Sequence, residues 1–427
     1  MKNKYIPLVS KVISFSYLII SIFLILFLIN KSESSLINNE ILYRYYLLIF
    51  ITFFLFSLFS FFIKNKLNIN FFLSFLSIIF TIYIIEIILV IKNTNKNNII
   101  FLNNKKITKH EYYLKEKQRD KNIKISITPS MMLNANGDIV PLAGLPNAVT
   151  IFCSEQNYFA TYQSDRHGFN NPDLEWDKSI VEYVLIGDSF VHGACVDEEH
   201  TITGNLRKIN KINYHKGILN LGMAGNGPLL EYATIKEYIP EMISEKVIWF
   251  YYEGNDFTDY YAQINPILVK YFKNNNYTQD IKIKQKEVNK IINSKIEYYE
   301  KYGDNKNIIK NILKLTNLRF FFNLIIVNKN PPINEFVEII SLTKNYLIKK
   351  DSKFYFVYLP SYQNNNNYNY ELIISKIKEL DIQIIDFSKI QLDDKNIQDF
   401  FITKQSHLSK EGYKFIAQCL YNLTKND

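Results

Sequence analysis

Residues 181–195 read VEYVLIGDSFVHGAC, and this stretch decides the fold. Its first part, residues 181–186, is a short run of β-branched and other apolar residues, which is typical of a buried strand and ends abruptly at Gly187. A serine on a tight turn between a buried strand and a helix is held out at the carboxyl edge of a sheet. Ser189 therefore stands where a nucleophile would be placed, although Asp188 and Ser189 are also good helix N-caps.

The rest of the chain predicts a sheet around this strand. Four further short apolar runs occur at residues 218–221, 246–252, 353–359 and 382–385, and helical patterns separate most of them. Strands that alternate with helices of ten or more residues are parallel and joined by right-handed crossovers. We therefore predict an α/β fold, a three-layer α/β/α sandwich with a mainly parallel sheet and its site at the carboxyl ends of the strands.

The N-terminal part has a different composition and predicts a membrane domain over residues 1–92. Three apolar runs, at residues 12–29, 45–63 and 71–91, are each about long enough to cross a bilayer as a helix. They are apolar on every face, unlike the helices of a soluble core. A cleaved signal peptide has only one such run, so the second and third runs argue against it. The sequence thus predicts three transmembrane helices.

Basic residues near the predicted spans indicate the orientation. Lys2, Lys4 and Lys11 precede the first span, and Lys64 and Lys66 lie between the second and third. By the positive-inside rule, the N-terminus is cytoplasmic and the protein is a multi-pass protein of the inner (plasma) membrane. The chain after residue 91 is then periplasmic or extracellular. Lysines just after the third span pull the other way, but long domains cross largely regardless of charge.

The soluble part divides into three regions. Residues 93–138 are polar and lysine-rich, which predicts a linker with room for one short helix. Residues 139–427 carry the α/β pattern, with an insertion at about 262–345 that contains amphipathic helices. Those helices have three open roles: to cap the active site, to rest on the membrane surface or to extend the core.

The charge does not indicate a nucleic-acid partner. The formal net charge is +9, but the lysines are spread along the chain, arginines are few, and no basic-aromatic motif occurs. His167 and His192 have no partners at metal-ligand spacing, so no metal and no cofactor is expected. The expected partners are the lipid bilayer and a substrate.

Three polar loops follow three consecutive predicted strands, and together they suit acyl transfer. They read GDSF at 187–190, GMAGN at 222–226 and GND at 254–256, and His407 precedes the last helix. Acyl transfer needs a nucleophile, a base and donors aimed at the developing oxyanion. Ser189 can supply the hydroxyl and His407 the imidazole. The backbone N–H groups of Ser189 and Gly225, with the Asn255 amide, can form the oxyanion hole.

These blocks, in this order, resemble the SGNH/GDSL hydrolase superfamily, in which four blocks contribute Ser, Gly, Asn and His. GDSF, NLGMAG, EGND and SHLSKEGY match the four blocks over about residues 140–427. The segment SDRHGFNNPD before GDSFVHGACV also looks like a membrane-anchored, exported subgroup. The resemblance implies a flavodoxin-like sandwich and carries the family roles to Ser189, Gly225, Asn255 and His407.

One position departs from the family pattern. An Asp usually stands two or three residues before the histidine and holds the imidazole, but here those positions are Gln405 and Lys404. Three readings stay open. The enzyme works as a Ser-His dyad with a backbone carbonyl or Gln405 orienting the ring, an acid such as Asp399 comes from elsewhere, or catalysis is weak or lost.

The cysteines add one expectation. In an oxidising compartment, a disulfide between Cys153 and Cys195 would tie the predicted hairpin at 139–165 to the helix after the nucleophile. Cys419 falls at a helical core position and is expected to be a free thiol.

The leading functional hypothesis is a membrane-anchored serine esterase that hydrolyses O-acyl esters, chiefly acetyl esters, on envelope carbohydrate or lipid through an acyl-serine intermediate. One alternative is an O-acyltransferase that uses the same residues with a polysaccharide hydroxyl as acceptor. The other is a catalytically inactive binding or assembly module that retains the fold.

Overall fold

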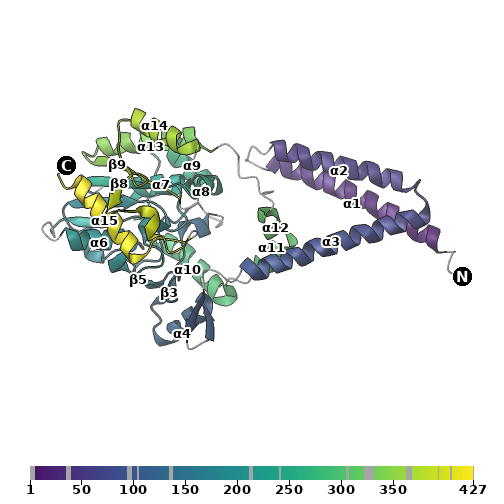
Figure 1. The fold of residues 1–427 in the computed structure, drawn as a ribbon, viewed down its shortest axis with the longest axis horizontal. Helices are drawn as coiled ribbons and strands as arrows, with labels where there is room; N and C mark the ends of the chain where they lie inside the picture. The colour runs from purple at the N-terminus through teal and green to yellow at the C-terminus, as the bar shows by residue number, and fades with distance from the viewer. Residues whose placement is uncertain are drawn as a thin grey trace. The chain divides into compact units, whose positions relative to one another are not determined.

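The structure is a computed structural model, and it describes residues 5–34, 40–93, 99–102, 105–133, 138–210, 215–239, 242–303, 307–321, 331–361, 368–392, 394–403 and 406–426. The described residues form two compact units, drawn in Figure 1. The first unit contains the N-terminal helices up to Asn93 and a short segment that begins at Ile308. The second unit contains the remainder.

Three long helices make up most of the first unit: α1 (Ile6–Ser34), α2 (Glu40–Ser60) and α3 (Asn65–Asn93). Within α1 and α3, the segments Ile6–Asn30 and Asn65–Lys92 are long and apolar enough to cross a membrane. The apolar stretch of α2, Tyr46–Ser60, is shorter. Two of the three predicted spans therefore meet the length and hydropathy of a membrane span by themselves, and the third meets only the hydropathy.

A buried polar contact joins the first and third helices. The side-chain amide of Asn68 in α3 donates to the hydroxyls of Ser10 and Ser14 in α1, at 3.0 and 2.9 Å. All three residues are buried. Small hydroxyl residues and amides of this kind hold apolar helices together, since their polar atoms find partners across the interface.

Glu86 is an acidic residue within the apolar helix α3, and it is fully buried. Its carboxylate accepts hydrogen bonds from the backbone N–H and side-chain amide of Asn317, both at 2.9 Å, and from the backbone N–H of Leu318 at 2.7 Å. These donors lie at the start of α12 (Thr316–Phe321), which follows α11 (Asn307–Leu313). A carboxylate is favoured at a helix N-terminus, where backbone N–H groups lack partners.

The second unit is built on a five-stranded sheet in which every strand is parallel to its neighbours. Its order is β10-β9-β8-β6-β7, which is the flavodoxin-like order with β6 first along the chain. This confirms the predicted fold class. The strands are β6 (Val181–Ile186), β7 (Gly217–Asn220), β8 (Ser244–Tyr252), β9 (Lys353–Leu359) and β10 (Gln383–Asp386).

Helices cover both faces of this sheet (Figure 1). Side chains alternate along β6, so Tyr183 and Leu185 pack with helices α6 and α15, while Val184 and Ile186 pack with α7, α13 and α14. The result is the predicted three-layer sandwich. The helices are α6 (Ile202–Ile209), α7 (Pro228–Tyr238), α13 (Ile333–Ile348), α14 (Tyr368–Glu379) and α15 (Lys410–Thr424).

The prediction of a linker over residues 93–138 is corrected by the structure. The described part of this segment folds within the second unit as β1 (Ile99–Leu102), β2 (Lys105–Thr108), α4 (Lys109–Arg119), β3 (Ile123–Ile125) and the 3-10 turn η1 (Pro129–Met132). β3 pairs in parallel with β4 (Val149–Ile151), which forms the expected hairpin with β5 (Thr161–Gln163). Strands of three or four residues are too short to show a periodicity in the sequence.

The insertion at 262–345 contributes mainly to the core. Helix α8 (Asp256–Ala262) leads into it, and α9 (Pro266–Lys273) and α10 (Gln285–Tyr302) lie within it. Leu268, Ile292 and Phe336 are fully buried in the larger core. Its segment around α12 belongs to the first unit. Smaller elements of the second unit are β11 (Gln391–Leu392), β12 (Lys395–Asn396), η2 (Asp173–Asp177), η3 (Glu198–His200) and η6 (Ile397–Phe400).

Candidate active site

The elbow after β6 places Ser189 at the start of a one-turn helix, α5 (Ser189–His192). The turn needs Gly187, because a Cβ at this position would lie 2.6 Å from a methyl carbon of Val191. Asp188 caps the helix by accepting the backbone N–H of Phe190 at 2.9 Å. Ser189 itself is 9% exposed. The predicted strand, turn and helix are all present, and the cap and the candidate nucleophile are adjacent residues.

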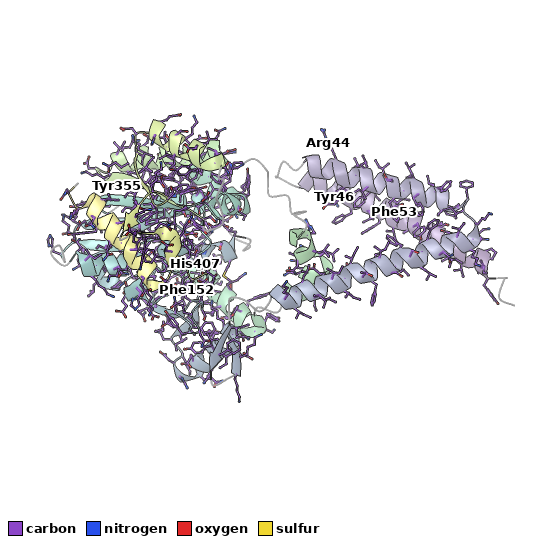
Figure 2. All side chains as sticks on the ribbon, viewed as in Figure 1. Arg44, Tyr46, Phe53, Phe152, Tyr355 and His407 are labelled. Carbon is purple, nitrogen blue, oxygen red and sulfur yellow. A yellow bond between two sulfur atoms is a disulfide. The ribbon has the colours of Figure 1, made fainter. Side chains whose placement is uncertain are left out.

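The structure brings His407 onto Ser189. Figure 2 labels His407 in the second unit, close to the start of the yellow helix α15. Its Nε2 lies 2.8 Å from the Ser189 hydroxyl oxygen. A β-bridge between Phe401 and Leu408 and a hydrogen bond from Ile402 N–H to the carbonyl of His407, at 3.1 Å, fix the histidine loop. The ring is therefore placed by backbone contacts on both sides of it.

Glu155 occupies the position of the missing acid. One carboxylate oxygen lies 2.8 Å from Nδ1 of His407, and the other accepts the backbone N–H of His407 at 2.9 Å. An ionised carboxylate only accepts hydrogen bonds, so Nδ1 carries the proton. Nε2 is then free to accept the proton of Ser189, which is the tautomer that a general base requires.

Of the three open readings, the structure fits the one in which an acid comes from elsewhere in the chain, but that acid is Glu155 and not Asp399. The carboxylate of Asp399 accepts the backbone N–H of Asn396 at 2.8 Å and closes a capping box at the start of η6. Gln405, the other candidate, lies outside the described residues. Glu155 was missed because it stands 252 positions from His407, in a hairpin loop that no catalytic motif marks. The signal that pointed to it was Cys153, since the expected disulfide already brought this loop to the elbow.

The loop after β7 contains Gly225, the second oxyanion donor that the sequence predicts. The backbone N–H groups of Ser189 and Gly225 have no acceptor among the described residues. Gly225 has a φ of +76°, and a Cβ there would lie 2.6 Å from the Ser130 hydroxyl. The carbonyl of Gly225 accepts the side-chain amide of Gln263 at 2.8 Å, which fixes the peptide. The turn therefore requires glycine and holds its N–H group unpaired, as an oxyanion hole needs.

Asn255 lies beside the nucleophile, but its side-chain amide already donates hydrogen bonds to two acidic residues. Its Nδ2 donates to a carboxylate oxygen of Asp188 at 3.2 Å and to one of Asp259 at 2.9 Å. The same oxygen of Asp188 lies 3.4 Å from the Ser189 hydroxyl. An oxyanion would have to replace one of these two acceptors, and the contact to Asp188 is the longer and therefore the weaker one.

Burial governs the protonation of this acidic group. Burial, and then the charge of Asp188, raises the pKa of Asp259 to about 7. Burial also raises the pKa of Asp188, and it raises those of the neighbouring Glu231 and Asp256 well above their usual range. These carboxyl groups therefore hold protons at pH values where exposed acids are ionised.

His192 supports the oxyanion loop. Its ring is fully buried, and burial lowers its pKa to about 3, so the imidazole is neutral. Nδ1 accepts the backbone N–H of Ala224 at 3.1 Å, which leaves the proton on Nε2 to be donated to the hydroxyl of Tyr162 at 3.1 Å. His192 is thus a positioning residue for the peptide next to Gly225.

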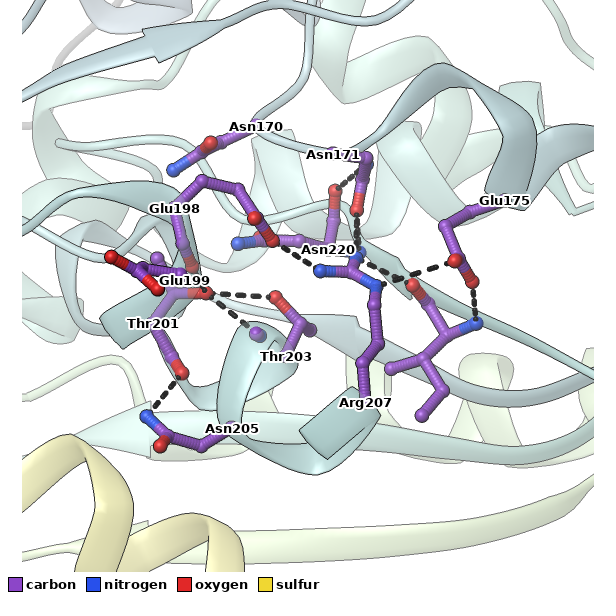
Figure 3. A network of polar contacts seen from close by, with 12 residues as sticks. Asn170, Asn171, Glu175, Glu198, Glu199, Thr201, Thr203, Asn205, Arg207 and Asn220 are labelled. Atoms are coloured by element: carbon purple, nitrogen blue, oxygen red, sulfur yellow. Dashed lines mark hydrogen bonds and ion pairs between the residues drawn. The ribbon is translucent and has the colours of Figure 1, made fainter. Parts of the chain in front are cut away.

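A polar network around Arg207 is drawn in Figure 3 and ends at the backbone of Val191 in α5. Arg207 forms an ion pair with Glu198 and donates to the side-chain oxygen of Asn171 at 3.0 Å. Asn171 and Asn220 exchange two hydrogen bonds, at 2.8 and 2.9 Å. The Asn220 amide then donates to the carbonyl of Val191 in α5 at 2.7 Å. This chain of contacts links the loop before β6, strand β7 and the nucleophile helix.

Cys153 and Cys195 form a disulfide. It joins the end of the β4–β5 hairpin to the segment just after α5, as the sequence analysis expected. Cys419 is a buried free thiol, and burial raises its pKa to about 11.

Comparison with known proteins gives structural likenesses only. No protein-family model and no curated protein matches the chain. A GDSL-like lipase from Bacteroides thetaiotaomicron is 9% identical, with 59% of this chain and 90% of that chain covered and a TM-score of 0.30. An acetyl xylan esterase is 11% identical, with 57% and 100% covered and a TM-score of 0.33. A two-domain esterase active on acetylated mannans is 10% identical, with 60% and 51% covered and a TM-score of 0.34.

Proposed function

We propose that the protein is a membrane-anchored serine esterase of the SGNH type, which hydrolyses O-acyl esters on envelope carbohydrate or lipid. The observation that carries the proposal is the hydrogen-bonded chain from Ser189 through His407 to Glu155, with 2.8 Å at each step. A nucleophile, a base and an orienting acid in this geometry define the serine-hydrolase arrangement, whatever their order in the sequence. The alternative of an inactive module was based on the absence of an acid near His407. Because Glu155 contacts His407, that reason no longer applies.

In the first half-reaction, His407 takes the hydroxyl proton of Ser189 while the oxygen attacks the ester carbonyl. The N–H groups of Ser189 and Gly225 stabilise the negative charge that develops on the carbonyl oxygen, and Asn255 adds a third donor. Glu155 stabilises the imidazolium that forms. His407 then protonates the departing alcohol, and the acyl group remains on Ser189.

In the second half-reaction, His407 removes a proton from water, which attacks the acyl-serine. Collapse of the second tetrahedral intermediate releases the carboxylic acid and returns the proton to Ser189. A sugar hydroxyl in place of this water would make the same residues an O-acyltransferase.

Two features support the substrate and location. Ser189 is only 9% exposed, which favours a short acyl group such as acetyl over a long chain. Two apolar helices long enough to cross a membrane, with a disulfide in the second unit, fit a multi-pass anchor in the inner membrane and a catalytic domain on its periplasmic or extracellular side.

The test is hydrolysis of p-nitrophenyl acetate by the full-length protein in detergent, compared with Ser189→Ala. The proposal predicts that the variant loses at least about 10³-fold in kcat, because removing the nucleophile leaves only the oxyanion hole and binding. Equal rates for the two proteins would contradict it. Adding an oligosaccharide and measuring acetylated product by mass spectrometry distinguishes transfer from hydrolysis.

A further inference from the structure

The disulfide lies close to Glu155, the acid that orients His407. Cys153 is two residues before Glu155, and Cys195 follows the nucleophile helix α5. Potential ligand atoms of Glu155, His407 and Cys195 lie within 4.8 Å of one another. The bridge therefore closes a short covalent path from the elbow to the acid that orients the histidine.

We propose that the Cys153–Cys195 disulfide is a redox-sensitive tether that holds Glu155 on His407, so that its reduction lowers the esterase activity. This inference rests on the proposed function. In the reduction, a dithiol gives two electrons and two protons to the disulfide. Cys153 and Cys195 become thiols, and the dithiol becomes a disulfide.

Few other contacts fix Glu155. It lies in the loop between β4 and β5, beyond the hydrogen bond from Ala160 N–H to the carbonyl of Cys153, at 2.9 Å. Within the part of the chain that the structure describes, the backbone of Glu155 makes no hydrogen bond. The far side of the loop has two other contacts: Asn157 accepts the backbone N–H of Phe101 at 2.7 Å, and the Tyr158 hydroxyl donates to the carbonyl of Cys195 at 3.4 Å. The disulfide is the covalent connection between the loop and the elbow.

His407 does not depend on this tether in the same way. Its loop is fixed by the bridge between Phe401 and Leu408, and Leu408 is fully buried. Reduction is therefore expected to leave the histidine near Ser189 and to release the carboxylate from Nδ1. The reduced enzyme should then behave as an enzyme that lacks its orienting acid.

A reductant can reach the bridge from one side. Cys195 is 2% exposed, whereas Cys153 is only partly buried. Thiol–disulfide exchange starts by attack of a thiolate on an accessible sulfur, so the geometry favours attack at Cys153. The new thiol of Cys195 would remain in the small apolar cluster with Phe152, Tyr162 and Ala194.

The experiment compares kcat for p-nitrophenyl acetate before and after reduction by dithiothreitol, in full-length wild type, Glu155→Gln and Cys419→Ala. Wild type and the Cys419→Ala control should both lose at least about tenfold and recover on reoxidation, since the orienting acid contributes up to about 10⁴-fold. Glu155→Gln should change less than about twofold, because its orienting carboxylate is already absent. A reduced wild type with unchanged kcat, or an equal loss in Glu155→Gln, would overturn the tether.

A second readout does not depend on turnover. The Nδ1 proton of His407, bound to a carboxylate, should give a low-field NMR signal in protein with ¹⁵N-labelled histidine, assigned by its loss in His407→Asn. The tether predicts that reduction shifts or removes this signal in the Ser189→Ala background, as Glu155→Gln does. A signal that reduction leaves unchanged contradicts the tether. Absence of Ser189-dependent hydrolysis in the oxidised protein contradicts the proposed function instead.

Discussion

Glu155 makes two hydrogen bonds to His407, one to the ring and one to the backbone, at 2.8 and 2.9 Å. The contact to the ring fixes the tautomer of the imidazole, whereas the bridge between Phe401 and Leu408 fixes the histidine loop. Glu155, from a loop far away in the sequence, thus contacts the ring nitrogen that an Asp near the histidine contacts in the motif that the sequence resembles. At the scale of single residues, the chemistry depends on this long-range contact.

Replacing Glu155 by Gln should lower kcat by as much as about 10⁴-fold, with a smaller effect on KM. The amide can keep a hydrogen bond to the ring but cannot stabilise the imidazolium, and it can favour the wrong tautomer. Asp399→Asn is the matched control, because its carboxylate caps η6 and should leave kcat nearly unchanged. Steady-state kinetics with p-nitrophenyl acetate make the comparison. A larger loss in Asp399→Asn than in Glu155→Gln would exclude Glu155 as the orienting acid.

Sequence reasoning reached the residues that sit in motifs and missed the one that does not. Ser189, Gly225, Asn255 and His407 each follow a strand or precede a helix, so their convergence could be predicted from the topology of a parallel sheet. Glu155 follows no such rule, since a hairpin loop can place its side chains in many directions. The occupation of the Asn255 amide by carboxylates was also beyond sequence reasoning, because it depends on side-chain orientation.

Among the elements, helix α8 and the elbow after β6 place two acidic side chains around the amide of Asn255. Asp259 comes from α8 and Asp188 from the elbow after β6, and both accept the amide of Asn255. Burial raises the pKa of Asp259 from its ordinary value of 3.8 to about 7. The folded protein thus holds a proton at pH 5 that the unfolded chain releases.

This shift has a defined sign. A raised pKa in the folded state stabilises folding below the unfolded value, and that stabilisation is lost as the pH rises from about 4 to 7. Asp259→Asn removes this titration. The melting temperature of the variant minus that of wild type should therefore increase from pH 5 to pH 8. Scanning calorimetry of both proteins measures the difference. Asp351→Asn, at an exposed position, serves as the control, and a pH-independent difference for Asp259→Asn would contradict the predicted shift.

The main strands and helices were predictable because their apolar runs are long or strongly patterned. All five strands of the sheet fall within two residues of their predicted positions, and α15 follows His407 as predicted. The folded segment after residue 98 was not predicted, since its strands are short and its polar residues outnumber the apolar ones. Helix α4 is the one short helix that the sequence allowed here, and Tyr113 is its one fully buried residue.

For the whole molecule, the proposed topology has the apolar helices in the membrane and the serine-esterase domain outside the cytoplasm. The proposed topology predicts that an alkaline phosphatase fused after Asp427 is active and that a green fluorescent protein fused there is dark, because each reporter folds on only one side of the membrane. The same pair fused after Lys4 should give the opposite result. Fluorescence from the C-terminal fusion without phosphatase activity would reverse the orientation.

Glu86 shows that the chain returns to the helical unit after leaving it. The carboxylate in α3 binds donors in α12, which lies 231 positions further along the sequence. Sequence reasoning treated the insertion as one block, whereas the structure divides it between the two units. That division could not be predicted, because the amphipathic pattern of a helix does not say which apolar surface it meets.

The central claim is that His407, held by Glu155, activates Ser189 as a nucleophile, and covalent labelling tests it without knowledge of the natural substrate. The oxidised full-length protein is treated with a fluorophosphonate, and the adduct is mapped by peptide mass spectrometry over time. We expect a single adduct on Ser189 that is absent in Ser189→Ala and forms at least about 10²-fold more slowly in His407→Ala. Failure of Ser189 to react, or an equal rate in His407→Ala, would contradict it.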